Sequence, residues 1–369
     1  FYTLHAIATM VFDQVAYKTV VSNGLVLDKN GQKMSKRLGN AVDPFETLAQ
    51  YGPDATRWYM LTNAQPWDNL RFDTEGIGEV QRKFFGTLHN TYAFFALYAG
   101  IDGWTPESEA PAVADRPELD RWILSRLHTC IAGVEEAFDS FEPTRAGRLV
   151  QSFVVDDLSN WYVRLGRRRF WKSDSDTDKA AAYATLHECL RTVSLLASPI
   201  APFFMDSLWQ DLGGADSVHL ADWPAEQNGL RDAELEARMD LAQRLSSLTL
   251  SLRKREKIRV RQPLGRILVP VLDAAFGVRL EAVAELVQGE VNVKAVEPLA
   301  EDSDILTKRL KADFKKLGPR YGKRMKAVAA AIGQLDQDAI RNLERHGKLD
   351  LNLEDGPVEL LLDDVEVQT

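Results

Sequence analysis

The chain has 369 residues, a formal net charge of −9 and 45% hydrophobic residues, a composition typical of folded domains and not of disordered chains. No apolar stretch approaches the roughly 18 residues that a membrane-spanning helix needs, which excludes a membrane role from the expected functions. The length predicts about two or three domains. The negative net charge argues only weakly against nucleic acid as a partner. The positive charge is concentrated in short stretches, and a locally basic surface can still bind phosphates.

The first predicted elements belong to an α/β domain. Residues 18–27 include TVVSNGLVL, a β-branched apolar run that predicts a parallel strand buried on both faces. The polar loop DKNGQKMSKRLGN follows. The string DPFE then places Asp at a helix cap, Pro at the first helical position and Glu at the third, and YGP ends this helix before the next begins. We expect residues 1–75 to be the closing part of a Rossmann-like nucleotide-binding domain.

The middle of the chain has helical apolar spacing. The predicted helical segments are 77–99, 117–139, 143–171 and 179–211. Proline-containing breaks and an acidic loop separate them, which favours an antiparallel helix bundle. An extended linker follows from Gly213 to Pro224. We expect residues 76–229 to form this helical domain with its linker.

The last part of the chain mixes element types. Helices are predicted at 232–255, 276–288, 319–333 and 336–346, and strands at 266–272, 291–296, 349–353 and 358–367. The mixture predicts a separate small α+β domain over 230–369. The fold class expected for the whole chain is therefore multidomain and mainly α.

The two cysteines argue against a disulfide framework of the kind that extracellular proteins use. Cys130 and Cys189 lie far apart, each in an apolar helical pattern, so two buried reduced thiols are expected rather than a disulfide. This usage favours a cytoplasmic setting. No CxxC pair or clustered histidines supply a zinc site of the usual spacing.

The most informative segment is the loop that contains KMSKR. Gly31 and Gly39 bracket it and would let it open and close over a ligand. Lys33 and Lys36 could converge on one polyphosphate and stabilise the charge that builds up on a leaving group. The alternative is a solvated, lysine-rich surface loop without chemistry.

KMSKR, followed by LGN and DP, resembles the second signature motif of class I aminoacyl-tRNA synthetases, whose usual form is KMSKS. Arg37 replaces the final Ser, as in some isoleucyl enzymes. The resemblance implies that ATP, with Mg²⁺, reacts with an amino acid to form an aminoacyl-adenylate. It implies that Lys36 contacts the ATP phosphates most directly, Lys33 assists, Ser35 holds the loop through hydrogen bonds, and Met34 anchors it by packing.

The same family needs a first signature, HxGH, and none of the six histidines lies in that arrangement. The family's inserted editing domain is not seen either. We therefore expect a C-terminal fragment that begins inside a larger fold and does not aminoacylate alone. In the full-length enzyme, the function would be ATP-dependent attachment of isoleucine to its tRNA. Some family enzymes bind zinc, but no residues here look able to hold it.

Residues 161–172, WYVRLGRRRFWK, interleave arginines with aromatic residues. Guanidinium groups can pair with RNA phosphates and aromatic rings can stack on unpaired bases. Trp161 and Phe170 are expected to be core residues. The arginines could instead form salt bridges with the acidic loop that contains Asp174, Asp176 and Asp178. The string resembles a helix of the anticodon-binding bundle in isoleucyl enzymes, which makes the candidate tRNA contacts Arg164, Arg167, Arg168 and Trp171.

Two further basic runs lie in the last domain, where such runs are usually solvated helix faces. IRVRQPL and LGPRYGK resemble stretches of isoleucyl enzymes of the eukaryote-like type. The resemblance implies a supporting tRNA surface near the anticodon stem. Its candidate residues are Lys254, Arg259, Arg261 and Lys323.

Two alternatives stay open. A valyl enzyme shares the LGN-x-x-DP continuation, although Arg37, the linker SVHLADWP and RVRQPL favour isoleucine. A non-catalytic tRNA-binding module would suit the missing HxGH but has no need of a phosphate loop. The expected partners are tRNA, ATP and isoleucine, and a monomer is expected.

Overall fold

The computed structural model describes residues 1–172, 175–227, 229–271, 273–299, 309–353 and 356–368, with only the backbone described for 323, 345, 352 and 368. The chain divides into two compact units, Phe1–Gln243 and Arg244–Thr369. Each unit is described by itself. Within the described residues, no helix combines the length and apolar character that crossing a bilayer requires.

The first unit begins with the α/β elements. They are α1 (Tyr2–Phe12), β1 (Val26–Leu27), α2 (Pro44–Tyr51), α3 (Pro53–Asn63) and β2 (Leu70–Arg71). Strands β1 and β2 pair in parallel, with Val26 opposite Leu70. The predicted helix start is confirmed, because the Asp43 carboxylate accepts hydrogen bonds from the N–H groups of Phe45 and Glu46.

The strand predicted over 18–27 is shorter and more exposed than expected. Only Val26 and Leu27 are in strand conformation. Val20, Leu25 and Val26 are 41–56% exposed, so the predicted burial on both faces was wrong. A parallel strand is buried when strands flank it and helices cover both faces, whereas in the described chain β1 lies in a sheet of two strands with β2.

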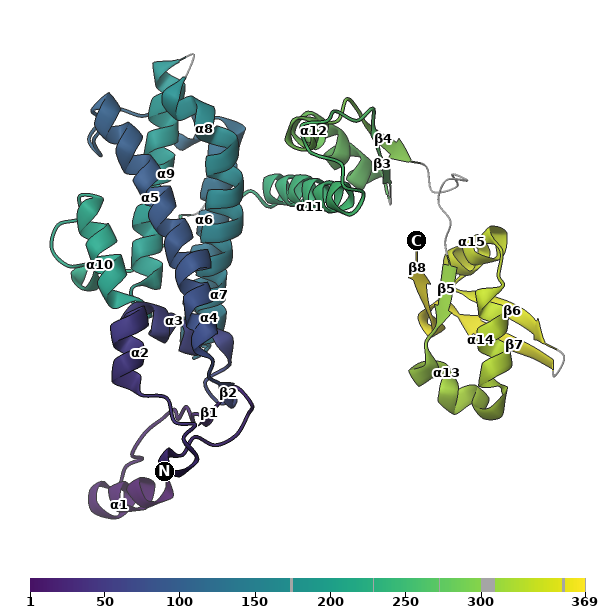
Figure 1. Cartoon of the computed structure of the whole chain (residues 1–369), viewed down its shortest axis with the longest axis horizontal. Coiled ribbons are helices and arrows are strands. Elements are labelled where there is room, and N and C mark those ends of the chain that lie inside the picture. The colour runs from purple at the N-terminus through teal and green to yellow at the C-terminus, as the bar shows by residue number, and fades with distance from the viewer. Residues whose placement is uncertain (173–174, 228, 272, 300–308, 354–355, 369) are drawn as a thin grey trace. The chain divides into compact units, whose positions relative to one another are not determined.

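The rest of the first unit is a helix bundle, as predicted (Figure 1). Its elements are α4 (Thr74–Val80), the π-helix η2 (Gln81–Phe85), α5 (Gly86–Asp102), the 3₁₀ turn η3 (Val113–Asp115), α6 (Glu118–Asp139), α7 (Pro143–Ser152), the π-helix η4 (Phe153–Val163), α8 (Arg164–Trp171), α9 (Asp176–Ala197), α10 (Pro202–Asp211) and the 3₁₀ turn η5 (Val218–Leu220). Elements α7, η4 and α8 follow one another without a break and form one rod.

The bundle core is filled by large apolar and aromatic side chains. Trp122, Phe84 and Tyr183 are among the largest fully buried ones. Trp161 and Phe170 are 4% and 1% exposed, which confirms them as core residues. The thiols of Cys130 and Cys189 are free and buried, and burial raises the pKa of Cys130 to about 12. These are inert structural thiols, as predicted.

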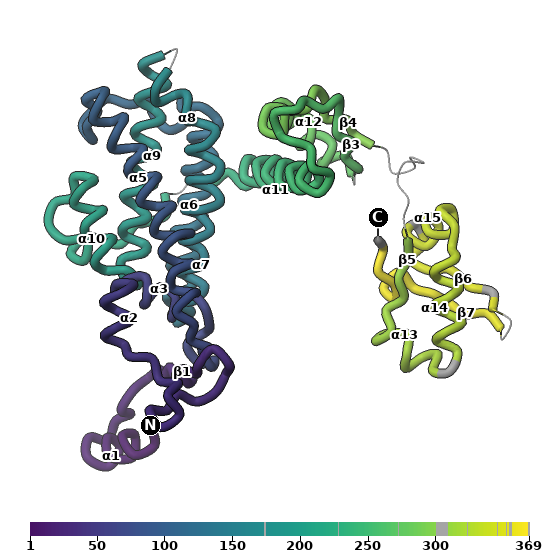
Figure 2. Tube along the Cα trace, in the orientation of Figure 1, coloured from purple at the N-terminus to yellow at the C-terminus, as the bar shows by residue number. Residues whose placement is uncertain are grey.

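Helix α11 (Ala233–Arg255) begins in the first unit and ends in the second. The second unit contains β3 (Ile267–Pro270), α12 (Ala274–Val291) and β4 (Val296–Leu299), followed by β5 (Arg309–Ala312), α13 (Phe314–Tyr321), the 3₁₀ turn η6 (Gly322–Arg324), α14 (Met325–Gly333), α15 (Gln337–His346), β6 (Lys348–Leu353), β7 (Gly356–Leu361), the 3₁₀ turn η7 (Leu362–Asp364) and β8 (Val365–Gln368). Figure 2 traces this order by colour.

The strands among the described residues of the second unit form three pairs. β3 and β4 are parallel, whereas β5 pairs with β8 and β6 with β7 in antiparallel fashion. Helices α14 and α15 bury Val328, Ile332 and Leu343 against strand residues such as Leu360. The strand predicted at 291–296 was misplaced, because α12 continues to Val291 and ends at Asn292 in a left-handed conformation.

Candidate nucleotide loop and nucleic-acid surface

Two polar side chains hold the loop that follows β1. The buried Asp28 carboxylate accepts hydrogen bonds from the N–H groups of Asn30 (3.0 Å) and Gln32 (2.8 Å) and from Nδ2 of Asn40 (2.9 Å). The hydrogen bond from Asn40, followed by that from Gln32, lowers the pKa of Asp28. Asn40 also accepts from the N–H of Ser35 (2.8 Å) and donates to the Lys33 carbonyl (3.3 Å). Asp28 and Asn40 therefore join the two ends of the loop.

The predicted lysines lie on this braced backbone. Lys33 forms an antiparallel bridge with Leu27. Ser35 caps the 3₁₀ turn η1 (Lys36–Leu38), since its Oγ accepts from the N–H of Arg37 at 3.2 Å. The side chains of Lys33 and Lys36 are both exposed. The loop thus combines a hydrogen-bonded backbone with two exposed ammonium groups, each a compact positive charge that can pair with a phosphate.

A third cation beside the loop was missed by the sequence analysis. Gly31 has a φ of +80°, and a Cβ there would lie 3.3 Å from Nε of Arg71. The Arg71 side chain therefore passes directly against the loop. It comes from β2, a two-residue strand whose sequence gives no periodic signal, so only the pairing of β2 with β1 could reveal this proximity.

Met34 faces an apolar cavity on the other side of the loop. The cavity has a volume of about 370 Å³ and is lined by Met34, by Val42 and Leu48 near and in α2, and by Met60 of α3, among others. Met34 is partly buried. The loop is thus held by apolar contact as well as by hydrogen bonds.

We expect Asp28→Asn to loosen the loop. The variant weakens the acceptor of the Asn30 and Gln32 N–H groups, so these amides should exchange with solvent faster in a hydrogen-exchange measurement. Because the folded-state pKa of Asp28 is lowered, the charged form braces the loop at neutral pH, and in the parent chain this bracing is lost as the pH falls through that pKa. Asp43→Asn is the control, since it should affect only the first turn of α2. Unchanged exchange at Asn30 and Gln32 would contradict the prediction.

At the other end of the first unit, α8 presents the predicted RNA-facing residues. The side chains of Arg164, Arg167, Arg168 and Trp171 are all exposed. Figures 1 and 2 show α8 at the end of the bundle opposite to β1 and β2. The loop and the α8 surface are therefore separated by the length of the bundle.

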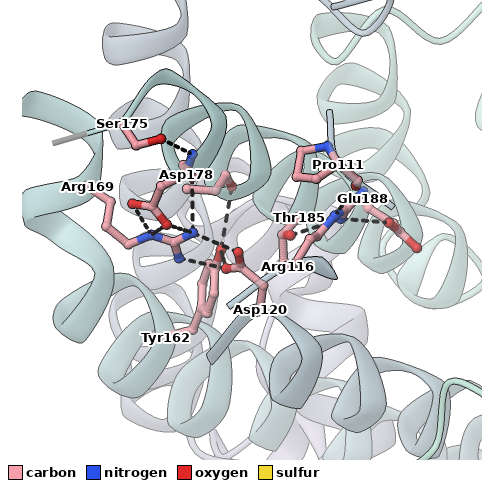
Figure 3. Close-up of polar contacts among 10 residues, drawn as sticks. Pro111, Arg116, Asp120, Tyr162, Arg169, Ser175, Asp178, Thr185 and Glu188 are labelled. Carbon is pink, nitrogen blue, oxygen red and sulfur yellow. Dashed lines mark hydrogen bonds and ion pairs between the residues drawn. The ribbon is translucent and has the colours of Figure 1, made fainter. Parts of the chain in front are cut away.

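Arg169, in the same run, has a different role (Figure 3). Its guanidinium donates two 2.7 Å hydrogen bonds to the carboxylate of Asp120, which is fully buried in α6. Its Nε donates to Asp178 of α9 at 3.0 Å, and the hydroxyl of Tyr162 also donates to Asp120 at 2.6 Å. Burial disfavours the charged form of Arg169 and lowers its pKa. The hydrogen bond to Asp120 and the negative charge of Asp120 outweigh burial, so the pKa of Arg169 is raised overall.

The cluster of Asp120, Tyr162, Arg169 and Asp178 was not predicted from the sequence, although a salt bridge from these arginines to the acidic loop was an open alternative. Asp178 is such a partner, whereas Asp174 lies outside the described residues. A usable signal was the position of Asp120 on the apolar face of α6, beside Trp122 and Ile123. A buried carboxylate there requires a cationic partner.

In the second unit the predicted residues Lys254, Arg259 and Arg261 are exposed. Arg253, beside them in sequence, is 2% exposed, and its guanidinium donates to the carbonyl groups of Arg259, Gln262 and Asn292. Arg253 therefore fixes the segment that carries the two exposed arginines. The side chain of the fourth candidate, Lys323, lies outside the described part of the structure.

No metal centre can be built from the described side chains, because no three His, Cys, Asp or Glu residues among them gather as ligands. The exposed charged groups of the loop and of α8, Lys33, Lys36, Arg164, Arg167 and Arg168, are cationic, and such groups are suited to binding phosphate.

Comparison with protein families agrees with this geometry. Residues 1–73 match the family model "tRNA synthetases class I (I, L, M and V)", and residues 120–268 match "Anticodon-binding domain of tRNA ligase". The chain therefore carries a class I tRNA synthetase region followed by an anticodon-binding region.

Over its whole length the chain is similar to isoleucine–tRNA ligases. It is 54% identical over 373 residues to the isoleucine–tRNA ligase of Bacteroides thetaiotaomicron and 55% identical over 368 residues to that of Porphyromonas gingivalis. Each alignment covers 100% of this chain and 32% of the relative, so the chain spans about a third of their length. Among solved structures, an Agrobacterium radiobacter LeuRS–tRNA–LeuAMS complex matches 63% of this chain and 28% of that chain, at 21% identity and a TM-score of 0.47.

Proposed function

We propose that the chain serves ATP-dependent attachment of isoleucine to its tRNA, as part of an isoleucine–tRNA ligase. The observation that carries this proposal is the pair Lys33 and Lys36 on a loop braced by Asp28 and Asn40. The relatives named isoleucine–tRNA ligase support isoleucine over valine as the amino acid.

In the proposed reaction the isoleucine carboxylate attacks the α-phosphate of ATP, and pyrophosphate leaves with the bond electrons. Lys36 and Lys33 would stabilise the negative charge that develops on the departing phosphates. Arg71 lies against the same loop and would add to the positive potential. Mg²⁺ would accompany ATP and offset phosphate charge; we propose no zinc site among the described residues.

The tRNA would contact the exposed cations at the other end of the first unit and those of the second unit. The proposed contacts in the first unit are the exposed Arg164, Arg167 and Arg168 together with Trp171, and the exposed Lys254, Arg259 and Arg261 are supporting contacts. Lys323 is proposed as a further supporting contact from the sequence alone. We further propose that residues 1–75 close the catalytic domain, 76–229 form the anticodon-binding domain and 230–369 a small α+β domain. A cytoplasmic monomer is proposed, and the two free buried cysteines support a reducing compartment.

The test is binding of isoleucine, valine and leucine tRNAs to the chain at two salt concentrations. We expect isoleucine tRNA to bind most tightly, with an affinity that falls as salt rises. Each neutralised phosphate of an RNA single strand should add about 0.7 to the slope of log Kd against log salt concentration. Binding without salt dependence would contradict the tRNA surface, and preference for valine tRNA would contradict isoleucine.

A further inference from the structure

The cavity beside Met34 has a buried floor and an open rim. Its volume is about 370 Å³, and the loop, α2 and α3 supply most of its lining (Figure 1). The floor consists of side chains that are 5–8% exposed, namely Thr47, Thr56 and Phe72. The rim consists of apolar side chains that are 37–38% exposed, namely Val42, Leu48 and Met60. A small molecule can therefore enter from solvent and reach a buried surface.

The polar side chains that line this cavity bond away from it. Thr47 and Thr56 each donate the hydroxyl to the backbone carbonyl four residues earlier, at 2.8 Å. The Arg57 guanidinium donates to the carbonyls of Ile200, at 2.8 Å, and Pro199, at 3.0 Å. The threonines therefore offer methyl groups to the cavity, and Arg57 offers the aliphatic part of its side chain. The lining thus gives a charged ligand no free partner.

These surroundings define the class of ligand. Water is held poorly in such a cavity, because a buried water molecule needs about two to four polar partners. An apolar cavity of about 150 Å³ stays dry and binds benzene. The volume of about 370 Å³ beside Met34 has room for a larger molecule. Pockets of about 300–1,000 Å³ with mainly apolar walls are typical of small-molecule sites.

We propose that this cavity binds a small uncharged apolar molecule, of the size of two fused aromatic rings, against Met34, and that the bound molecule stabilises the nucleotide loop. The proposal goes beyond the proposed function, which assigns no ligand to the cavity. Two methionines, Met34 and Met60, line the site from opposite elements, the loop and α3. The unbranched thioether side chain adapts its shape to a ligand, which suits a site of this kind.

Met34 connects the cavity to the nucleotide loop. Lys33 is exposed, whereas Met34, the next residue, is partly buried and lines the cavity. Successive side chains of an extended segment point to opposite sides, so a ligand against Met34 leaves Lys33 free. The next N–H, that of Ser35, donates to Asn40 at 2.8 Å. A ligand that holds Met34 in place therefore also holds the backbone that makes this hydrogen bond.

The experiment uses the 369-residue chain labelled with ¹³C at its six methionine methyl groups. Naphthalene is the probe, and 2-naphthoate is a charged molecule with the same two rings. The NMR signals of Met34 and Met60 report on the cavity, and Met205, fully buried in α10, is the internal reference. Met34→Leu and Met60→Leu assign the two signals.

Two further variants test the location of the site. Val42→Phe places a ring at the rim and narrows the cavity. Val278→Phe is the matched control, because Val278 is 69% exposed on α12 of the second unit. Circular dichroism checks that each variant is folded. The comparison of naphthalene with 2-naphthoate in the parent chain depends on neither variant.

Naphthalene is expected to shift the signals of Met34 and Met60 progressively as its concentration rises, and to leave Met205 unchanged. The same concentration of 2-naphthoate should shift neither signal, because burying its carboxylate without a partner is costly. The shifts should be lost in Val42→Phe and kept in Val278→Phe. Hydrogen exchange at the Ser35 N–H should slow when naphthalene is present.

Unshifted Met34 and Met60 signals would overturn the proposal. So would equal shifts from naphthalene and 2-naphthoate, shifts of the same size at Met205, or shifts that persist in a folded Val42→Phe chain. Shifted methyl signals with unchanged exchange at Ser35 would show that the ligand does not stabilise the loop. None of these results bears on tRNA binding or on Lys36, so the proposed function is tested separately.

Discussion

Replacing Asp120 with alanine is expected to lower the free energy of unfolding of the first unit by about 3–5 kcal/mol. The variant leaves the Arg169 guanidinium, whose side chain is only 16% exposed, without its principal counter-charge. It also removes the acceptor of the buried Tyr162 hydroxyl. Breaking one partner of a buried pair is costly because the remaining charge stays out of water. Urea or thermal unfolding, followed by circular dichroism, measures the change.

The matched control is Glu136→Ala, which removes an exposed partner of Arg145. Exposed ion pairs contribute about 0–1 kcal/mol, so this variant should be nearly as stable as the parent chain. The double variant Asp120→Leu with Arg169→Met should recover part of the stability lost in Asp120→Ala, because no unpaired charge remains buried. Equal stabilities of Asp120→Ala and Glu136→Ala would contradict the stabilising role of the buried Asp120–Arg169 pair.

Lys36→Ala, made in an enzyme of the relatives' full length that contains this chain, is expected to reduce ATP–pyrophosphate exchange by about 10²- to 10³-fold. Loss of one group that stabilises transition-state charge has an effect of this size. Lys36→Arg should retain part of the activity, because it keeps the charge but not the compact ammonium geometry. The proposed tRNA contacts on α8 lie at the other end of the bundle, so binding of isoleucine tRNA should be unchanged.

Lys29→Ala is the control for Lys36→Ala. Lys29 is an exposed lysine of the same loop region, at its turn, and has no proposed contact with ATP. Its loss should leave pyrophosphate exchange close to that of the parent enzyme. Unimpaired exchange in Lys36→Ala, or an equal loss in both variants, would remove Lys36 from the proposed reaction.

The helices of this chain were predictable because their signal is local. The segment predicted at 117–139 is α6 at Glu118–Asp139, since apolar residues repeat along it with helical spacing. The run at 18–27 was predicted poorly, because burial of a strand depends on distant neighbours and not on its own residues.

For the candidate site, the sequence indicated the loop lysines, Ser35 and Met34, but not the bracing of the loop by the side chains of Asp28 and Asn40. The three adjacent arginines of α8 also show how far sequence alone can predict the role of a side chain. Arg167, Arg168 and Arg169 are equivalent in composition, yet only Arg169 reaches the carboxylate of Asp120. Which residue points inward depends on the rotation of the helix, and sequence spacing predicts that rotation only if the helix is regular.

The rod that ends in α8 is not regular, because η4 (Phe153–Val163) is wound as a π-helix between two α-helical segments. A π-helix takes up more residues per turn than an α-helix, so it offsets the angular phase of everything that follows. Successive residues of an α-helix are about 100° apart around the axis. Deleting one residue within η4 would therefore turn α8 by about that angle, swinging Arg169 toward solvent and a neighbouring side chain toward Asp120. The π-helical winding of η4 therefore determines which side chains of α8 face solvent, and a change in the length of η4 would alter the proposed RNA-binding surface without replacing any of its residues.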